Sequence, residues 1–322
     1  MVDKNIEMGK ANLEIFAQTL QQLAEKDQNI LVVTSDSRGS GKLTAFGEAL
    51  PKQIIEIGIA EQNMVGISAG LASSGKKVFT VSPACFLTAR ALEQIKNDVA
   101  YSNNPVKVVG ISAGVSYGSL GTTHHSIHDF AVLQAINNID IVVPADNYET
   151  REAIVAAVNY PKPLYIRFGK KSMPVKLPAL GSFEIGKASH LKPKKDHYQV
   201  TFIANGETVY PSFLAGNLLE QNNISCNVVS LHTIRPLDSQ AIKTAAINSD
   251  LLITVEEHCV NGGIGSRIAN LLVEERLYTP MKIIGLPDDH TVAGSQEEIF
   301  EHYGISPQSL ADTAIDALEV SK

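Results

Sequence analysis

The sequence lacks the features that would direct the chain to a membrane, to the cell exterior or to a nucleic acid. None of its apolar runs approaches the length of a membrane span. Its first residues, MVDKNIEMGKANLE, contain neither the basic nor the apolar part of a secretion signal, and its three cysteines show no CxxC spacing. A net charge of −7 gives no electrostatic reason to bind a phosphate backbone. We therefore expect a soluble cytoplasmic protein with no nucleic-acid or membrane partner.

Apolar residues are plentiful and follow an α/β pattern. At 322 residues with 44% hydrophobic content, the chain is long enough for two compact domains. Short apolar runs alternate with segments of helical periodicity, which predicts a mostly parallel sheet covered by helices on both faces. The strands expected in the first half are NILVVTSD, QIIEIG, KVFTVS, VKVVGIS, DIVVPAD and PLYIRF.

A change of composition divides the chain. Residues 171–195 are rich in lysine and proline, which is typical of a linker. A second alternation of strands and helices follows it, with YQVTFIANG, SCNVVSL and DLLITVEE as strands. We therefore predict a first α/β domain over residues 1–170 and a smaller α/β domain over residues 196–322.

Polar segments follow the predicted strands of the first domain. These include SDSRGSGK, GIAEQN and SAGVSYGSLGTTHHSIHD. Ligands gather at the carboxyl ends of parallel strands, so these segments predict a site for a polar anionic ligand. Glu61 lies in one of them, at the start of an expected helix. Taken alone, a carboxylate there commonly satisfies the free N–H groups of the helix.

The surroundings of Glu61 change that interpretation. The segment IGIAEQNMVGISAGLA resembles the pyrimidine-binding domain of thiamine-diphosphate enzymes of the transketolase type. The resemblance continues in order through FLTARALEQIKNDVAY, GTTHHSIHDFAVLQAI, IVVPADNYETREAIVAA, PLYIRFGK, SLHTIRPLD and TVEEHCVNGGIGS. In this family a carboxy-terminal α/β domain follows the pyrimidine-binding domain, which agrees with the two domains predicted here.

The resemblance implies a thiamine diphosphate site with three residues of this chain. Glu61 matches the carboxylate that hydrogen-bonds N1′ of the cofactor and favours the imino tautomer, the base for the thiazolium C2 proton. Phe86 is similar to the aromatic residue that stacks on the pyrimidine ring. Ile59 lies in the same segment as Glu61 and is expected to contact the cofactor. Pro83 stands where the family often has a second aromatic residue.

The resemblance also implies residues for a sugar phosphate. His124 matches a histidine that reaches the reacting oxygens of the donor, and we expect a catalytic role for it. His125 stands where the family more often has glutamine. Ser40 and Lys170 align with the serine and the basic residue that hold the terminal phosphate, and Arg38 lies close enough in sequence to Ser40 to add a bidentate contact.

One departure concerns the donor sugar. The chain has GSLG at residues 118–121, where pentose-phosphate transketolases usually have GEDG. Leu120 therefore replaces an aspartate that contacts a sugar hydroxyl, and it makes no hydrogen bond to that group. This favours a non-standard donor, such as a branched ketose of the apulose 4-phosphate kind, with xylulose 5-phosphate as the alternative.

A second departure concerns the diphosphate. The family holds the diphosphate and Mg²⁺ through a GDG element and a downstream asparagine in an amino-terminal domain, and this chain has no such element. We therefore expect no metal ligand here and a separate amino-terminal subunit, assembled as a 2+2 heterotetramer. The resemblance predicts transfer of a two-carbon ketol unit from a ketose phosphate to an aldose phosphate such as glyceraldehyde 3-phosphate. The alternatives are the β subunit of a 2-oxoacid dehydrogenase decarboxylase component, a deoxyxylulose-phosphate synthase fragment, or a non-catalytic homologue.

Overall fold

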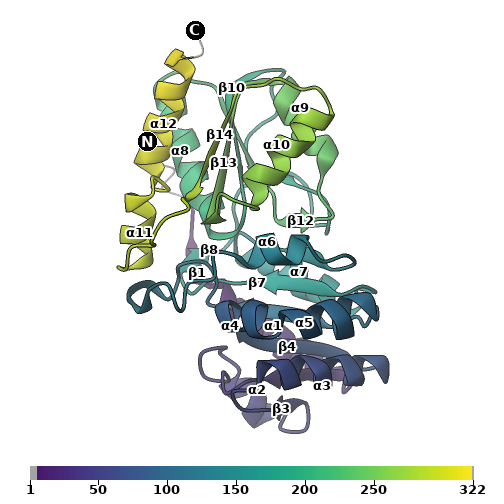
Figure 1. The fold of residues 1–322 in the computed structure, drawn as a ribbon. Coiled ribbons are helices and arrows are strands. Elements are labelled where there is room, and N and C mark those ends of the chain that lie inside the picture. The colour runs from purple at the N-terminus through teal and green to yellow at the C-terminus, as the bar shows by residue number, and fades with distance from the viewer. Residues whose placement is uncertain (1–5, 321–322) are drawn as a thin grey trace.

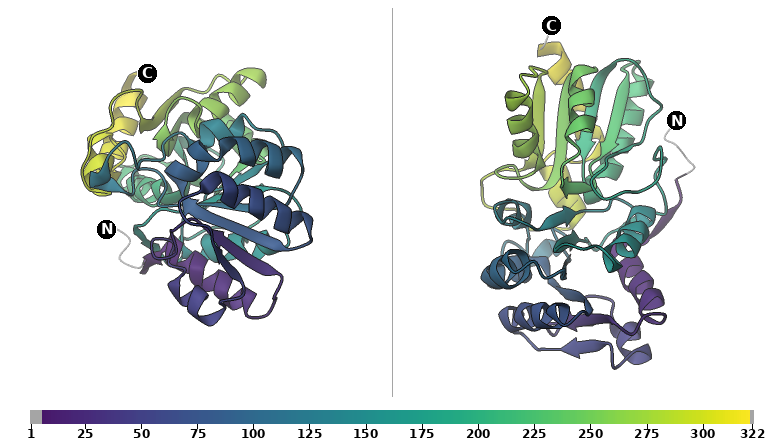
Figure 2. Two further views of the ribbon diagram at one scale, coloured as in Figure 1. Left: turned by 60° about the horizontal axis from the view of Figure 1, so that its bottom comes forward. Right: turned by 90° about the vertical axis from the view of Figure 1, so that its right-hand side faces the viewer.

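The computed structural model describes residues 6–320, which form two α/β lobes stacked one on the other (Figures 1 and 2). Residues 1–5, the start of the segment in which we expect no secretion signal, lie outside the described residues. Each lobe is built on a mostly parallel sheet, which confirms the predicted fold class. Between residues 6 and 320, no helix is both long enough and apolar enough to cross a bilayer.

The first lobe contains a seven-stranded sheet in the order β12-β6-β7-β5-β4-β2-β3. Every neighbouring pair is parallel except β12 and β6. All residues of β2, β5 and β7 are buried, and this explains their continuous apolar runs. The strands are β2 (Ile30–Thr34), β3 (Ile54–Glu56), β4 (Lys77–Pro83), β5 (Lys107–Ile111), β6 (Asp140–Val142), β7 (Leu164–Arg167) and β12 (Thr233–Arg235).

Helices cover both faces of this sheet, as the apolar strands require. Phe16 and Ile154 belong to the core on one face, and Met64, Leu87 and Phe130 belong to the core on the other. The helices of the lobe are α1 (Asn12–Ala24), α2 (Thr44–Ala49), α3 (Glu61–Ser73), α4 (Ala84–Arg90), α5 (Leu92–Gln94), the π-helix η1 (Ile95–Tyr101), the 3₁₀ turn η2 (Gly118–Leu120), α6 (Asp129–Gln134) and α7 (Asn147–Val158).

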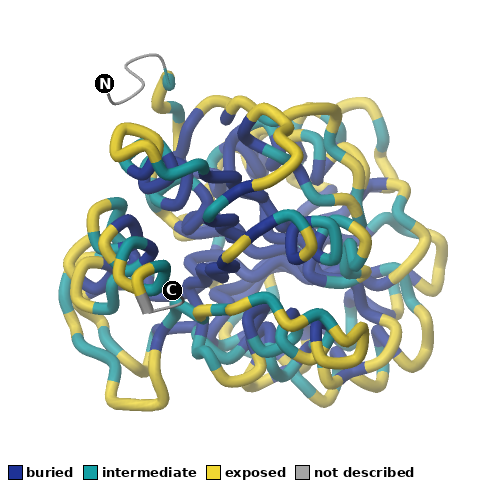
Figure 3. Tube along the Cα trace, turned by 90° about the horizontal axis from the view of Figure 1, so that it is seen from above, coloured by how far each residue is buried: buried dark blue, intermediate teal, exposed yellow. Residues whose placement is uncertain are grey.

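The second lobe contains a five-stranded sheet in the order β14-β13-β10-β11-β9, and the interior of the molecule is buried beneath exposed outer segments (Figure 3). Its strands are β9 (Ser189–His190), β10 (Tyr198–Ala204), β11 (Cys226–Ser230), β13 (Ser249–Cys259) and β14 (Met281–Leu286). Its helices are η3 (Gly206–Thr208), α8 (Val209–Gln221), α9 (Ser239–Ile247), α10 (Ile264–Glu274), α11 (Gln296–His302) and α12 (Pro307–Val320).

Strand β14 and helix α11 of the second lobe are among the elements that were not predicted from the sequence. Strand β14 lies at the edge of its sheet and is mostly half-buried, so its apolar pattern is weak. Helix α11 has only seven residues, too few for a clear periodicity. Its capping box, in which Ser295 and Glu298 satisfy each other's backbone N–H groups, was the available signal.

The predicted linker, residues 171–195, is hydrogen-bonded to both lobes. Within it, β8 (Ser172–Pro174) pairs with β1 (Met8–Ala11), and β9 joins the second sheet through β11. The chain also returns to the first lobe after β11, where β12 pairs with β6. The lobes therefore share a strand and a continuous hydrophobic core, in which Ile141 and Val143 lie in the same cluster as Ile203 and Leu231.

Candidate active site

A sharp turn after β3 separates an exposed apolar side chain from a buried carboxylate. Gly58 has φ +78°, a backbone conformation that residues other than glycine rarely adopt. Ile59 follows and is 74% exposed. Glu61 is the first residue of α3 and is 4% exposed. The turn thus places Ile59 at the lip, and Glu61 at the wall, of a cleft of about 580 Å³ lined by residues 59–63 and Arg90.

Glu61 is held by a cation and not by the start of its own helix. Arg90, the last residue of α4, donates from Nη1 to Glu61 Oε1 at 3.0 Å. The same guanidinium lies over the ring of Phe86, with Cζ 4.3 Å from the ring centroid. Arg90 follows Phe86 by four residues on one helix, the spacing at which side chains meet. That spacing was the signal for Arg90, which the sequence interpretation missed.

A row of aromatic rings continues from the cleft across the carboxyl ends of the strands. The rings of Phe86 and His124 pack edge to face with centroids 5.3 Å apart, and His124 packs in the same way on Tyr117 at 5.3 Å. Lys170 Nζ lies 4.8 Å from the centroid of Tyr117. The structure thus brings Glu61, Phe86, His124 and Lys170 together as one site. Tyr117 joins them, although it was not predicted.

A hydrogen bond from the buried side chain of His125 holds the GSLG turn, residues 118–121. Gly118 has φ +55°, and a Cβ there would lie 2.7 Å from the carbonyl oxygen of Gly294 in the second lobe. His125 is 3% exposed, and burial lowers its pKa, which favours the neutral ring. Its Nε2 lies 3.0 Å from the carbonyl oxygen of Gly118, so Nε2–H is the donor. The turn leaves Leu120 54% exposed.

Two predicted phosphate ligands lie in the loop after β2 and make local contacts. Ser40 is exposed, and its Oγ donates to the carbonyl oxygen of Ser37 at 3.2 Å. Arg38 packs against Gly47 and lies 3.9 Å from Glu56. These contacts do not join Ser40 or Arg38 to Lys170.

The donor set of the cleft fits one part of a thiamine cofactor. A buried carboxylate, an aromatic face and an exposed apolar lip suit a planar heteroaromatic ring that can be protonated. A metal diphosphate needs several carboxylate or carbonyl oxygens around one cation. The part of the chain that the structure describes contains no group of three or more His, Cys, Asp or Glu able to hold a metal ion.

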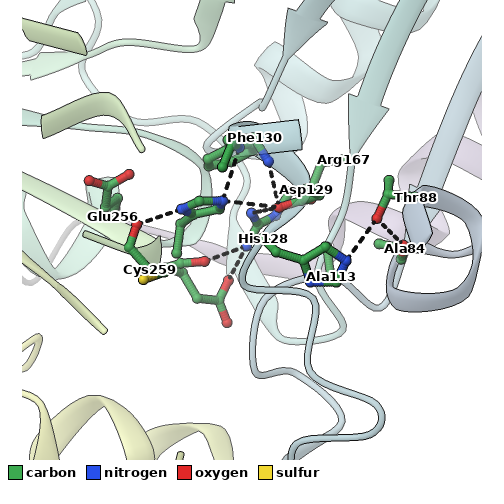
Figure 4. A network of polar contacts seen from close by, with 12 residues as sticks. Ala84, Thr88, Ala113, His128, Asp129, Phe130, Arg167, Glu256 and Cys259 are labelled. Carbon is green, nitrogen blue, oxygen red and sulfur yellow. Dashed lines mark hydrogen bonds and ion pairs between the residues drawn. The ribbon is translucent and has the colours of Figure 1, made fainter. Parts of the chain in front are cut away.

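Behind the site, a buried ionic network joins the two lobes (Figure 4). Arg167, at the end of β7, lies 3.0 Å from the carboxylate of Asp129 and donates to the carbonyl oxygen of Glu257 at 2.6 Å. His258 stacks on Phe130 with centroids 4.8 Å apart. The EEH motif, residues 256–258 within TVEEHCVNGGIGS, therefore positions the second lobe against the first.

The buried carboxyl group of Glu256, the first residue of that motif, predicts a pH dependence of stability. Burial raises the pKa of Glu256 to about 8. Hydrogen bonds from the backbone N–H groups of Ile264 at 2.7 Å and Gly265 at 3.1 Å lower this pKa but do not outweigh burial. The folded state thus binds this proton more tightly than the unfolded chain, so its contribution to stability falls as the pH rises from about 4.5 to about 8. Glu256→Gln is expected to make this fall shallower, by up to about 1.4 kcal/mol per pH unit. Urea unfolding across this range measures it, and Glu274→Gln, at an exposed position of α10, is the control. An unchanged slope in Glu256→Gln would contradict the prediction.

Comparison with known proteins identifies the family. Residues 9–176 match the family model of the transketolase pyrimidine-binding domain, and residues 186–310 match the transketolase C-terminal domain. The chain is 46% identical over 302 residues to an apulose-4-phosphate transketolase subunit of Phocaeicola vulgatus, covering 94% of this chain and 95% of the relative. It is 34% identical over 306 residues to a putative transketolase C-terminal section of Methanocaldococcus jannaschii, covering 94% and 95%. A solved split-gene transketolase, described as an inactive β4 tetramer, matches with a TM-score of 0.87 and 30% identity over 98% of this chain and all of that one. The chain therefore belongs to the transketolase family of thiamine-diphosphate-dependent enzymes, and its two lobes are the pyrimidine-binding and C-terminal domains of that family.

Proposed function

We propose that this chain is the carboxy-terminal subunit of a two-subunit transketolase that moves a two-carbon ketol unit from a ketose phosphate to an aldose phosphate such as glyceraldehyde 3-phosphate. The observation that carries the proposal is a cleft with a buried Glu61 on its wall, in which Arg90 contacts both that carboxylate and the face of Phe86. The match along nearly the whole length of relatives named as parts of a transketolase supports it.

Each residue of the cleft has a distinct task toward the cofactor. Thiamine diphosphate, when bound, supplies the carbon nucleophile that carries the two-carbon unit. Glu61 holds a proton at the pyrimidine N1′, and its low exposure keeps water from competing for that proton. Phe86 orients the ring through its face, and Ile59 covers it from the lip of the cleft.

The row of aromatic rings leads from the cleft to the substrate. We assign His124 to the reacting oxygens of the donor, because its ring packs directly against Phe86. Lys170 lies at the far end of the row, is exposed and suits the terminal phosphate as a point charge. Ser40 and Arg38 are assigned to the same phosphate on the family pattern. His125 acts from within, by holding the turn that carries Leu120.

A partner subunit completes the proposed enzyme. Since residues 6–320 offer no metal-binding cluster of His, Cys, Asp and Glu, we assign Mg²⁺ and the diphosphate to an amino-terminal subunit. Two copies of each subunit would place every cofactor between two chains. One relative is named as a transketolase subunit and the other as a transketolase C-terminal section, and both names support such a division of the enzyme.

The donor assay separates the proposed function from its alternatives. The chain, its amino-terminal partner, thiamine diphosphate and Mg²⁺ are combined, and ketol transfer to glyceraldehyde 3-phosphate is followed from apulose 4-phosphate and from xylulose 5-phosphate. We expect transfer from the branched donor, because the relative from Phocaeicola vulgatus is named for apulose 4-phosphate. The exposed apolar side chain of Leu120 in the GSLG turn supports the same expectation. Decarboxylation of a 2-oxoacid in place of ketol transfer would assign the chain to the dehydrogenase alternative.

Leu120 is the residue expected to set donor preference. Leu120→Asp restores a group that hydrogen-bonds a sugar hydroxyl, so the ratio of kcat/KM for xylulose 5-phosphate to that for apulose 4-phosphate should rise by at least about 10-fold. Leu180→Asp makes the same change at another leucine, 55% exposed in the predicted linker, and should leave the ratio unaltered. If both variants keep the wild-type ratio, Leu120 has no part in donor choice.

A further inference from the structure

The guanidinium of Arg90 makes both contacts that a ring in the cleft would need. Its Nη1 donates to Glu61 at 3.0 Å, and its Cζ lies 4.3 Å from the centroid of Phe86. A guanidinium is planar, delocalised and rich in N–H donors, so it stacks on an aromatic face and binds a carboxylate at the same time. An aminopyrimidine is likewise planar and needs the same two partners.

The two ends of this contact differ in freedom. The side chain of Arg90 is 49% exposed, whereas that of Glu61 is 5% exposed at the start of α3. Arg90 is also the last residue of α4, where a long side chain can turn toward solvent without unwinding a helix. Of the two side chains, Arg90 is the one that is free to move, and when it moves it opens both Glu61 and Phe86.

Resting on the proposed function, we propose that Arg90 is a positioning residue that occupies the pyrimidine half-site of the free subunit and is displaced from Glu61 and Phe86 when the cofactor ring enters. Until then Arg90 compensates the buried charge of Glu61, which would otherwise lack a cation. After displacement, Glu61 is available to the ring nitrogen. Cofactor binding is therefore a competition between the ring and the guanidinium for the same two side chains.

The competition predicts that removing the guanidinium tightens cofactor binding. Thiamine diphosphate is titrated by calorimetry into the complex of this chain with its amino-terminal partner at saturating Mg²⁺. Arg90→Gln is expected to lower Kd by about 5- to 30-fold, since a half-exposed ion pair and a cation–π contact no longer have to be broken. Arg90→Lys keeps the charge but lacks the planar guanidinium, so its Kd should lie between those of wild type and Arg90→Gln. Arg151→Gln, at an exposed position of α7, is the matched control and should bind as wild type does.

Crystal structures give a second readout that does not depend on turnover. The free subunit should show Arg90 on Glu61, and the cofactor-loaded complex should show Arg90 outside hydrogen-bond distance of Glu61, with the ring over Phe86. A Kd in Arg90→Gln that is unchanged or weaker than wild type, or a loaded complex in which Arg90 still donates to Glu61, would overturn this proposal without bearing on the proposed ketol transfer. A wild-type complex that binds no thiamine diphosphate would overturn both this proposal and the proposed function.

Discussion

Glu61→Gln is expected to lower kcat for ketol transfer in the assembled enzyme by about 10²- to 10⁴-fold, the usual contribution of a positioned proton-transfer group. The amide has the size of the carboxylate but exchanges no proton with the pyrimidine nitrogen. With Glu61 only 4% exposed, water has little access to replace it. The amide oxygen still accepts a hydrogen bond from Arg90, so the fold of α3 should be preserved. Initial rates at saturating donor and acceptor measure the loss.

Two controls separate lost chemistry from lost structure. Glu93→Gln makes the same change at an exposed position of α5 and should retain wild-type turnover. The far-ultraviolet circular dichroism of Glu61→Gln should match that of wild type. Turnover by Glu61→Gln within a factor of about 10 of wild type, below the range for a proton-transfer group, would mean that Glu61 does not perform the assigned step.

Arg167→Leu should lower the free energy of unfolding by about 3–5 kcal/mol, the range for breaking a buried ion pair by removing one partner. Arg167 is 4% exposed and lies 3.0 Å from Asp129 and 3.4 Å from the carboxylate of Glu257. Leucine fills part of the space but leaves two buried carboxylates without their cation. It also removes the donor to the carbonyl oxygen of Glu257 at the lobe interface. Urea unfolding of the chain measures the change.

An exposed ion pair provides the comparison for Arg167. Lys243 and Glu275 lie 3.1 Å apart, both partly exposed, and such pairs contribute up to about 1 kcal/mol. Lys243→Met should therefore destabilise the chain far less than Arg167→Leu. Equal losses in the two variants would show that the buried network does not hold the lobes together.

The strands and helices that the sequence predicts are those with a strong burial pattern. Strands β2 and β5 are wholly buried, and the segment around Glu61 reads as the start of a helix, which is where α3 begins. Strand β12 could not be predicted in this way. Its pairing with β6 depends on a return of the chain to the first lobe, which no local sequence pattern indicates.

Some residues of the candidate site were predicted from the sequence and others were not. The polar segments at the ends of the strands predicted where the site lies, and the family resemblance supplied the roles of Glu61, Phe86 and His124. Arg90 and Tyr117 were not predicted. The spacing of Arg90 from Phe86 was readable in the sequence, but its ion pair with Glu61 and the packing of Tyr117 on His124 are contacts that the sequence does not indicate. Ser40 was predicted by alignment with the family, and its contact in the structure is local to its own loop.

The central claim is that this chain supplies one half of a thiamine-dependent active site and a partner supplies the other. The most direct measurement is ketol transfer to glyceraldehyde 3-phosphate, with thiamine diphosphate and Mg²⁺, by this chain alone, by the amino-terminal subunit alone and by the two together. We expect transfer only when both subunits are present. Full transfer by either subunit alone, or none by the pair with any ketose phosphate donor, would contradict it.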